Sequence, residues 1–98
     1  MDNANIFEIT DKSGRKISLP KERWEHIIEH KGMDKYLEEI KNTLINPNLI
    51  VPHKFDEDKR NYYRHYKDRN RYLLVVVKYL NGKGYISTAF ITRKIIKR

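Results

Sequence analysis

The hydrophobic pattern of the first half of the chain changes from a two-residue repeat to a helical repeat. Alternating apolar positions come first, on either side of a turn in which Gly14 supplies a positive φ. After Pro20, which suits the first turn of a helix, apolar residues recur three and four positions apart, with a break at Gly32. This pattern predicts strands over residues 6–10 and 16–19, then helices over residues 21–31 and 34–45.

The second half returns to a two-residue repeat and predicts four strands. Its continuous apolar run, Leu73–Val77, is typical of a central strand that is buried on both faces. The predicted strands cover residues 49–53, 60–67, 71–79 and 85–92, and residues 93–98 form a basic tail. Helices followed by a run of strands indicate an α+β fold. We therefore expect the N-terminal hairpin and both helices to pack on a C-terminal antiparallel sheet of about four strands.

Length and composition limit the classes of protein to which the chain can belong. Ninety-eight residues can build one hydrophobic core, so we expect a single domain over residues 1–98. The absence of cysteine excludes disulfides, thiolate metal sites and a cysteine nucleophile. The longest apolar run is far too short to span a bilayer, and the first residues lack the pattern of a signal peptide. We therefore expect a cytoplasmic protein with no membrane contact.

The net charge of +8 is concentrated in one half of the sequence. Residues 1–58 hold 9 basic and 12 acidic side chains, a net charge of −3. Residues 59–98 hold 12 basic side chains and 1 acidic one, a net charge of +11. Such segregation favours a polyanionic partner such as nucleic acid. The simpler alternative is that the charge serves only solubility.

Two histidines on the first predicted helix are the first candidates for chemistry. His26 and His30 are four residues apart, so a helix would place them on the same side. Paired imidazoles suit general acid–base catalysis near neutral pH. Alternatively both are simply solvated, or His30 borders the core. A metal site is not expected, because the segment lacks an HExxH motif and a third ligand at a telling spacing.

Basic and aromatic side chains interleave along the strand predicted over residues 60–67. Alternation places Tyr62, Arg64 and Tyr66 on one face of that strand, and Tyr63, His65 and Lys67 on the other. Cations and rings on a sheet suit RNA, because cations bind phosphates and rings stack on unpaired bases. An ordinary half-exposed strand explains the tyrosines equally well. On the last strand, the hydroxyls of Thr88 and Thr92 could donate to a phosphate, and both are expected to share a face with Ile86 and Phe90.

Five short motifs occur in an order that resembles a known family. They are Arg23–His30, Thr43–Asn48, Tyr62–Arg64, Leu73–Lys78 and Ser87–Thr92. Together they resemble the phage-associated branch of the barnase–EndoU–colicin–RelE nuclease superfamily over roughly residues 20–94. The chain departs from that pattern at Lys31–Met33, where a His-Pro-type helix ending would be expected.

The resemblance implies an α+β nuclease that cleaves RNA without a metal or other cofactor, often as a toxin or effector. The hypothesis is attack by the 2′-hydroxyl of RNA, which leaves 2′,3′-cyclic phosphate ends. His30 is the preferred base and His26 its partner or the acid, with the assignment between the two left open. Arg64 would clamp the phosphate, Thr88 would donate to it, and Tyr63 would stack on a base or donate a proton. The other expected RNA contacts are Arg60, Tyr62, Tyr66, Lys67, Lys78, Arg93 and Lys94.

Two other classes of function stay open at this point. A non-catalytic RNA- or DNA-binding module explains the charge and the tyrosines but has no need of the histidines. A protein-interaction domain would use its basic face to bind an acidic partner. A toxin would need such a partner too, namely an acidic antitoxin or immunity protein. The sequence does not select among transfer RNA, ribosome-bound messenger RNA and phage RNA, nor does it set the oligomeric state.

Overall fold

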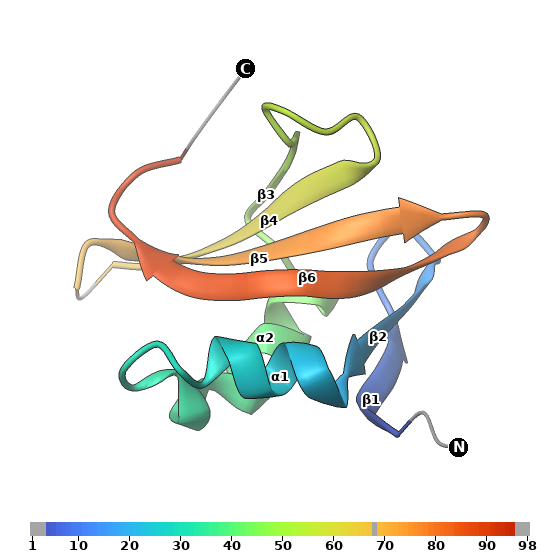
Figure 1. Cartoon of the computed structure of the whole chain (residues 1–98). Coiled ribbons are helices and arrows are strands. Elements are labelled where there is room, and N and C mark those ends of the chain that lie inside the picture. The colour runs from blue at the N-terminus through green and yellow to red at the C-terminus, as the bar shows by residue number, and fades with distance from the viewer. Residues whose placement is uncertain (1–3, 68, 96–98) are drawn as a thin grey trace.

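The computed structural model describes residues 4–67 and 69–95 as one six-stranded sheet with helices on one side (Figure 1). Residues 96–98 of the predicted basic tail lie outside the described residues. The strands are β1 (Asn5–Thr10), β2 (Lys16–Pro20), β3 (Leu49–Pro52), β4 (Lys59–Tyr66), β5 (Arg71–Leu80) and β6 (Lys83–Thr92). The helices are α1 (Lys21–Ile27), the 3₁₀ turn η1 (Met33–Tyr36) and α2 (Leu37–Ile45). The α+β class is confirmed.

The strand order is β1-β2-β6-β5-β4-β3, and only the β2–β6 pair within this sheet is parallel. The expected four-stranded antiparallel sheet is therefore incomplete, because the N-terminal hairpin extends the sheet instead of packing on it. Gly84 lies where β2, β6 and β5 meet, and its tightest contact is with β5. It pairs with Ile17, and a Cβ at Gly84 would lie 2.6 Å from the carbonyl oxygen of Lys78. The pattern of a single strand does not reveal such a partner.

The first helix ends earlier than its hydrophobic pattern predicts. After Ile27 the backbone changes to tighter bonds, in which the amides of Glu29 and His30 donate to carbonyls three residues back. Gly32 then reverses the chain with φ of +85°. The second helix also begins later than predicted, because residues 33–36 form η1 and bury Met33.

The sheet has a core on each face. The helix-covered face packs Leu73, Val75 and Val77 of β5 against Ile40 and Leu44 of α2. No helix of residues 4–67 and 69–95 covers the other face, which we call the open face. It holds a smaller cluster of Tyr63, Leu74 and Val76, with Phe90 and Ile95 packed against it. The predicted burial of Leu73–Val77 on both faces is confirmed.

A bulge in β6 changes which of its side chains share a face. Thr88 pairs with Val76 but Ile86 pairs with Val77, so Ser87 is the extra residue. Thr88 and Phe90 consequently lie on the open face, whereas Ile86 is buried in the helix-side core. The expectation that Ile86 shares their face is wrong for this reason.

No helix in the described part of the chain is long and apolar enough to cross a membrane.

Candidate functional site

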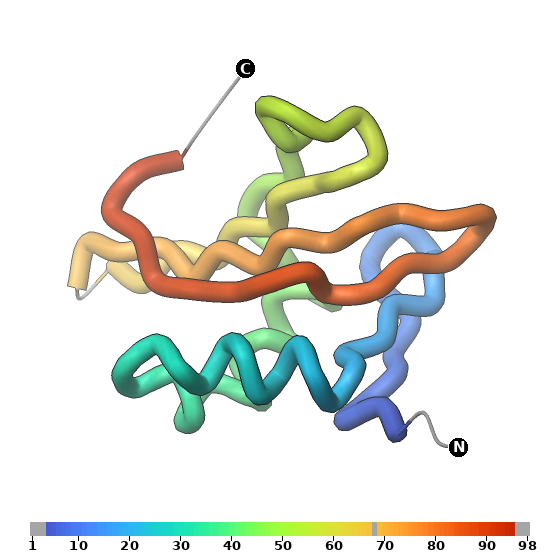
Figure 2. Tube along the Cα trace, in the orientation of Figure 1, coloured from blue at the N-terminus to red at the C-terminus, as the bar shows by residue number. Residues whose placement is uncertain are grey.

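Helix α1 runs beside β6 and in the same direction (Figure 2). Two contacts fix their alignment. The guanidinium carbon of Arg23 lies 5.7 Å from the ring centroid of Tyr85, and the ring of His30 lies 6.2 Å from that of Phe90. His26 falls between the two contacts along the helical segment, and Thr88 falls between them along the strand. The two elements therefore bring the imidazoles alongside β6, where the ring of His30 lies near Phe90 at the edge of the sheet.

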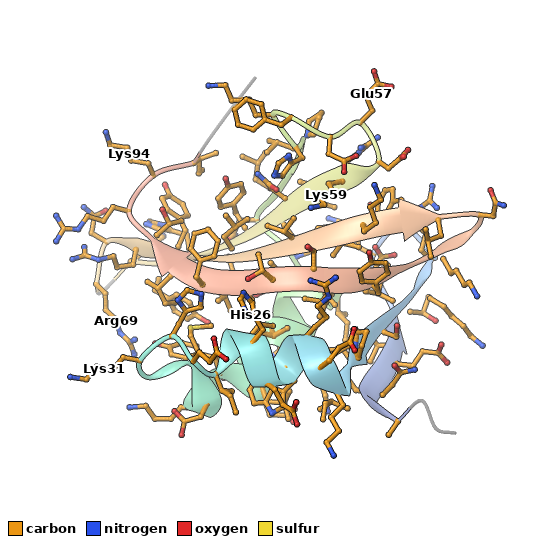
Figure 3. All side chains as sticks on the ribbon, viewed as in Figure 1. His26, Lys31, Glu57, Lys59, Arg69 and Lys94 are labelled. Carbon is orange, nitrogen blue, oxygen red and sulfur yellow. The ribbon has the colours of Figure 1, made fainter. Side chains whose placement is uncertain are left out.

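The two histidines are brought together, although not on one helix as predicted. His26 belongs to α1, whereas His30 lies in the tight turn that follows it. Their ring centroids are 6.2 Å apart with the ring planes at 81°. Both residues are exposed, and Nδ1 of His26 lies 3.8 Å from a carboxylate oxygen of Glu29. His26 is seen between α1 and β6 in Figure 3.

Arg64 lies on the other side of the sheet from Thr88. It pairs with Leu73 on the helix-covered face, and its guanidinium donates a hydrogen bond of 2.6 Å to the carbonyl of Asn46. Tyr63 points to the opposite face, as the alternation predicts. The structure therefore does not bring Arg64 together with Thr88, and the expected phosphate clamp has no route to the open face.

Both neighbouring tyrosines are core residues rather than stacking surfaces. Tyr63 is fully buried on the open face, with its ring 6.0 Å from that of Tyr72. Tyr62 is fully buried on the helix side, where its hydroxyl donates to Asp11 and lies 2.5 Å from the hydroxyl of Tyr79. Burial, with the bonds to Asp11 and Tyr79, raises the pKa of Tyr62. The expectation that Tyr62 contacts RNA is therefore wrong, because its side chain is buried. Tyr63 is buried too, so its ring cannot stack on a base in this arrangement.

The remaining expected RNA contacts are spread over different surfaces. Arg60 lies on the helix side against the ring of Tyr79, and the half-buried Tyr66 packs near Tyr36. Lys78 is on the open face, but its ammonium is 2.9 Å from a carboxylate oxygen of Asp56. Hydrogen bonding between them lowers the pKa of Asp56 and raises the pKa of Lys78. The three exposed cations of the set are Lys67, Arg93 and Lys94.

The structure adds residues that sequence reasoning missed. Arg23 precedes His26 by three positions, so both lie on one side of α1. This spacing could have identified Arg23 as a candidate from the sequence. Tyr85 and Phe90 flank Thr88 on the open face, but the bulge at Ser87 hides this from simple alternation. Asn61 is 3% exposed, and its buried side-chain oxygen has no partner within the described residues. It lies in the same cross-strand row as Val76 and Thr88.

The described residues hold no group of three or more His, Asp or Glu side chains arranged to bind a metal ion. The site instead combines two imidazoles, one guanidinium, one threonine hydroxyl and two aromatic rings. Such a set can exchange protons and bind an anion.

Comparison with protein families gives a match over almost the whole chain. The model of a family described as phage-Barnase-EndoU-ColicinE5/D-RelE like nuclease 2 matches residues 3–98. No curated protein and no solved structure matches the chain.

Proposed function

Because the chain belongs to the phage-Barnase-EndoU-ColicinE5/D-RelE like nuclease 2 family, we propose that it is a metal-independent endoribonuclease. The edge formed by α1 and β6 is the catalytic site in this proposal. The observation that carries it is the position of the imidazoles, with His30 against Phe90 and His26 a further 6.2 Å away. A module that only binds nucleic acid has no need of this pair.

The proposed reaction uses the 2′-hydroxyl of RNA as the nucleophile. His30 takes the hydroxyl proton, and the oxygen attacks the adjacent phosphorus. The bond to the leaving 5′-oxygen breaks, and His26 gives that oxygen a proton. The products are a 2′,3′-cyclic phosphate and a 5′-hydroxyl. The separation of 6.2 Å lets the two rings reach different oxygens of one phosphodiester.

Charge on the reacting phosphate needs a cation on the same face. We assign this role to Arg23 instead of Arg64, because Arg23 lies beside Tyr85 at the same α1–β6 edge. Its planar guanidinium suits two oxygens of a phosphate, and the hydroxyl of Thr88 adds a neutral donor. Electrostatic stabilisation of this kind strengthens as charge develops on the non-bridging oxygens.

The proposed biological role is that of a toxin or effector acting on RNA. The support is the family and the net charge of +11 in residues 59–98. An acidic antitoxin that covered the α1–β6 edge would complement this charge. Expression with and without an acidic neighbouring gene product tests this role, and equal growth in both cases would contradict it.

The catalytic proposal is tested on a labelled RNA with a single cut site. We expect cleavage in EDTA, cyclic phosphate ends, and no cleavage when the nucleotide at the cut carries a 2′-deoxy sugar. His30→Ala and His26→Ala should each lower kcat by about 10²- to 10⁴-fold. His53→Ala is the matched control, because His53 sits at the start of the β3–β4 loop and its ring accepts a bond from the amide of Phe55.

Two results would decide against the proposal. Cutting of the 2′-deoxy substrate would exclude the mechanism. Full activity of the His26→Ala, His30→Ala double variant would show that the two imidazoles take no part in catalysis. If the wild type and this variant bind RNA equally and neither cleaves it, the chain is a binding module.

A further inference from the structure

A cleft of about 390 Å³ opens at the Arg23 end of the α1–β6 edge. The N-terminal hairpin supplies one wall through Lys16 and Ser18, and β6 supplies the other through Lys83 and Tyr85. Arg23 lines the cleft from α1. A helix rises about 1.5 Å per residue, so Arg23 is only about 4.5 Å along the axis from His26. The cleft is thus next to the proposed reaction centre.

Two lysines stand side by side in this cleft. Lys16 and Lys83 are partners in the parallel β2–β6 pair, and neighbouring strands lie about 4.8 Å apart. Neither ammonium forms an ion pair within residues 4–67 and 69–95. Like charges opposite each other destabilise a sheet. An anion bound between them would relieve that repulsion.

The cleft also carries an aromatic surface and hydrogen-bond acceptors. Tyr85 is half-buried, and Arg23 lies over its ring at 5.7 Å. Glu8 and Glu22 line the cleft without pairing with either lysine. A ring beside cations is the combination that binds unpaired nucleotides, and carboxylates accept hydrogen bonds from the edges of bases.

We propose that this cleft binds a nucleotide adjoining the scissile phosphodiester. Its base stacks against Tyr85, and the next phosphate along the chain lies between Lys16 and Lys83. The adjoining position rests on the proposed ribonuclease function, whereas binding in the cleft does not. The chemistry recognised is that of a single-stranded nucleic acid, whose bases are free to stack.

Binding is measured first, with a labelled 2′-deoxy oligonucleotide that cannot be cleaved, by fluorescence anisotropy. Tyr85→Leu should weaken affinity by about 5- to 150-fold, because one stacked base is lost. The double variant Lys16→Ala, Lys83→Ala should weaken binding and reduce the slope of log K against log salt by about 0.7 to 1. The matched control is Lys31→Ala, Lys35→Ala, which removes two exposed lysines near η1 and should change neither quantity.

Cleavage then tests where the nucleotide lies. A dinucleotide lacks the next phosphate, so the Lys16, Lys83 variant should cleave it like the wild type but lose about tenfold or more in kcat/KM on longer RNA. An equal loss of kcat/KM on the dinucleotide and on longer RNA would contradict the proposal that the bound nucleotide adjoins the scissile phosphodiester. Unchanged oligonucleotide affinity in both cleft variants would overturn the inference even if RNA is cleaved. If no substrate is cleaved, the proposed function fails while the anisotropy result still decides the cleft.

Discussion

At the residue scale, the most informative group is the pair Tyr62 and Tyr63. They are adjacent in sequence, yet they enter separate cores on opposite faces of the sheet. Tyr62 also ties the β1–β2 turn to β4, because Asp11 accepts its hydroxyl while another oxygen of Asp11 accepts the amides of Ser13 and Arg15. The role of Tyr62 is therefore to stabilise the fold.

Tyr62→Phe should therefore lower stability and leave RNA affinity unchanged. The change removes a donor from the buried Asp11, and an unsatisfied buried group costs about 1–3 kcal/mol. Urea unfolding measures this loss. Tyr72→Phe is the control, since the Tyr72 hydroxyl has no hydrogen bond to the described residues. Weaker RNA binding at unchanged stability would restore Tyr62 as a contact.

Among single residues, the sequence predicted the pairing of His26 with His30 but not the face on which Arg64 lies. The spacing of His26 and His30 indicated a pair, and the structure brings the rings together by a tight turn. The family resemblance implies a phosphate contact for Arg64, yet strand alternation turns its side chain to the helix-covered face. Which face of a strand meets a helix depends on tertiary packing, so a single sequence could not exclude Arg64.

At the element scale, strand types were predictable and strand partners were not. The Leu73–Val77 run identified the central strand, because successive side chains point to opposite faces and all are buried only where both faces of the sheet are covered. The parallel β2–β6 pair left no periodic signal, because the apolar repeat of a strand marks its buried face and not the strand that lies beside it. The early end of α1 likewise depends on local bonds that the apolar repeat does not encode.

Gly84→Ala tests the close approach of β6 to β5 next to the β2–β6 junction. The new Cβ would meet the backbone oxygen of Lys78 at 2.6 Å, and backbone cannot yield as a flexible side chain does. We expect a loss of about 1–3 kcal/mol in the free energy of unfolding, the usual cost of overpacking. Urea unfolding of Ser18→Ala, a substitution in the same strand pair that adds no atoms, provides the control. Wild-type stability in Gly84→Ala would contradict this close approach.

The loop between β3 and β4 is tied to the sheet by an ion pair that depends on pH. The hydrogen bond from Lys78 lowers the pKa of Asp56 from 3.8, so folding favours the carboxylate. A carboxyl with a lowered pKa in the folded state stabilises the protein above its unfolded pKa. This contribution is lost as pH falls through the folded value.

Asp56→Asn should therefore be less stable than the wild type at pH 7. The difference should persist down to about pH 3.8 and shrink below it, where the wild-type carboxyl also becomes neutral. Urea unfolding across pH 7 to 2 measures the difference. Glu57→Gln, at an exposed neighbour in the same loop, should show no such pH dependence. A difference that stays constant to pH 2 would show that the ion pair is not its cause.

At the scale of the whole molecule, the positive charge is concentrated in the strands and not in the helices. Residues 21–45, which form the helices, carry 5 basic and 6 acidic side chains, whereas residues 59–98 carry a net charge of +11. The helices lie on one side of the sheet (Figure 1). A polyanion approaching from a distance is therefore drawn to the strands rather than to the helices.

Salt should consequently weaken the reaction on long RNA much more than it weakens the fold. Contacts to about three phosphates of a single strand predict a loss of about tenfold or more in kcat/KM between about 50 and 200 mM salt. A dinucleotide, which makes fewer phosphate contacts, should lose far less. Cleavage rates and urea unfolding measured at the same salt concentrations separate the two effects. Equal salt dependence for both substrates would mean that long-range charge has no part in substrate binding.

The β2–β6 pairing also affects when the proposed site can assemble during synthesis. The histidines leave the ribosome before β6, which carries Thr88 and joins the N-terminal hairpin to the rest of the sheet. Pairing so distant in sequence closes late in folding. A nascent chain thus carries its imidazoles without the strand that they must face. On the proposed function, the chain therefore cleaves no RNA, including the message being translated, until that strand has paired.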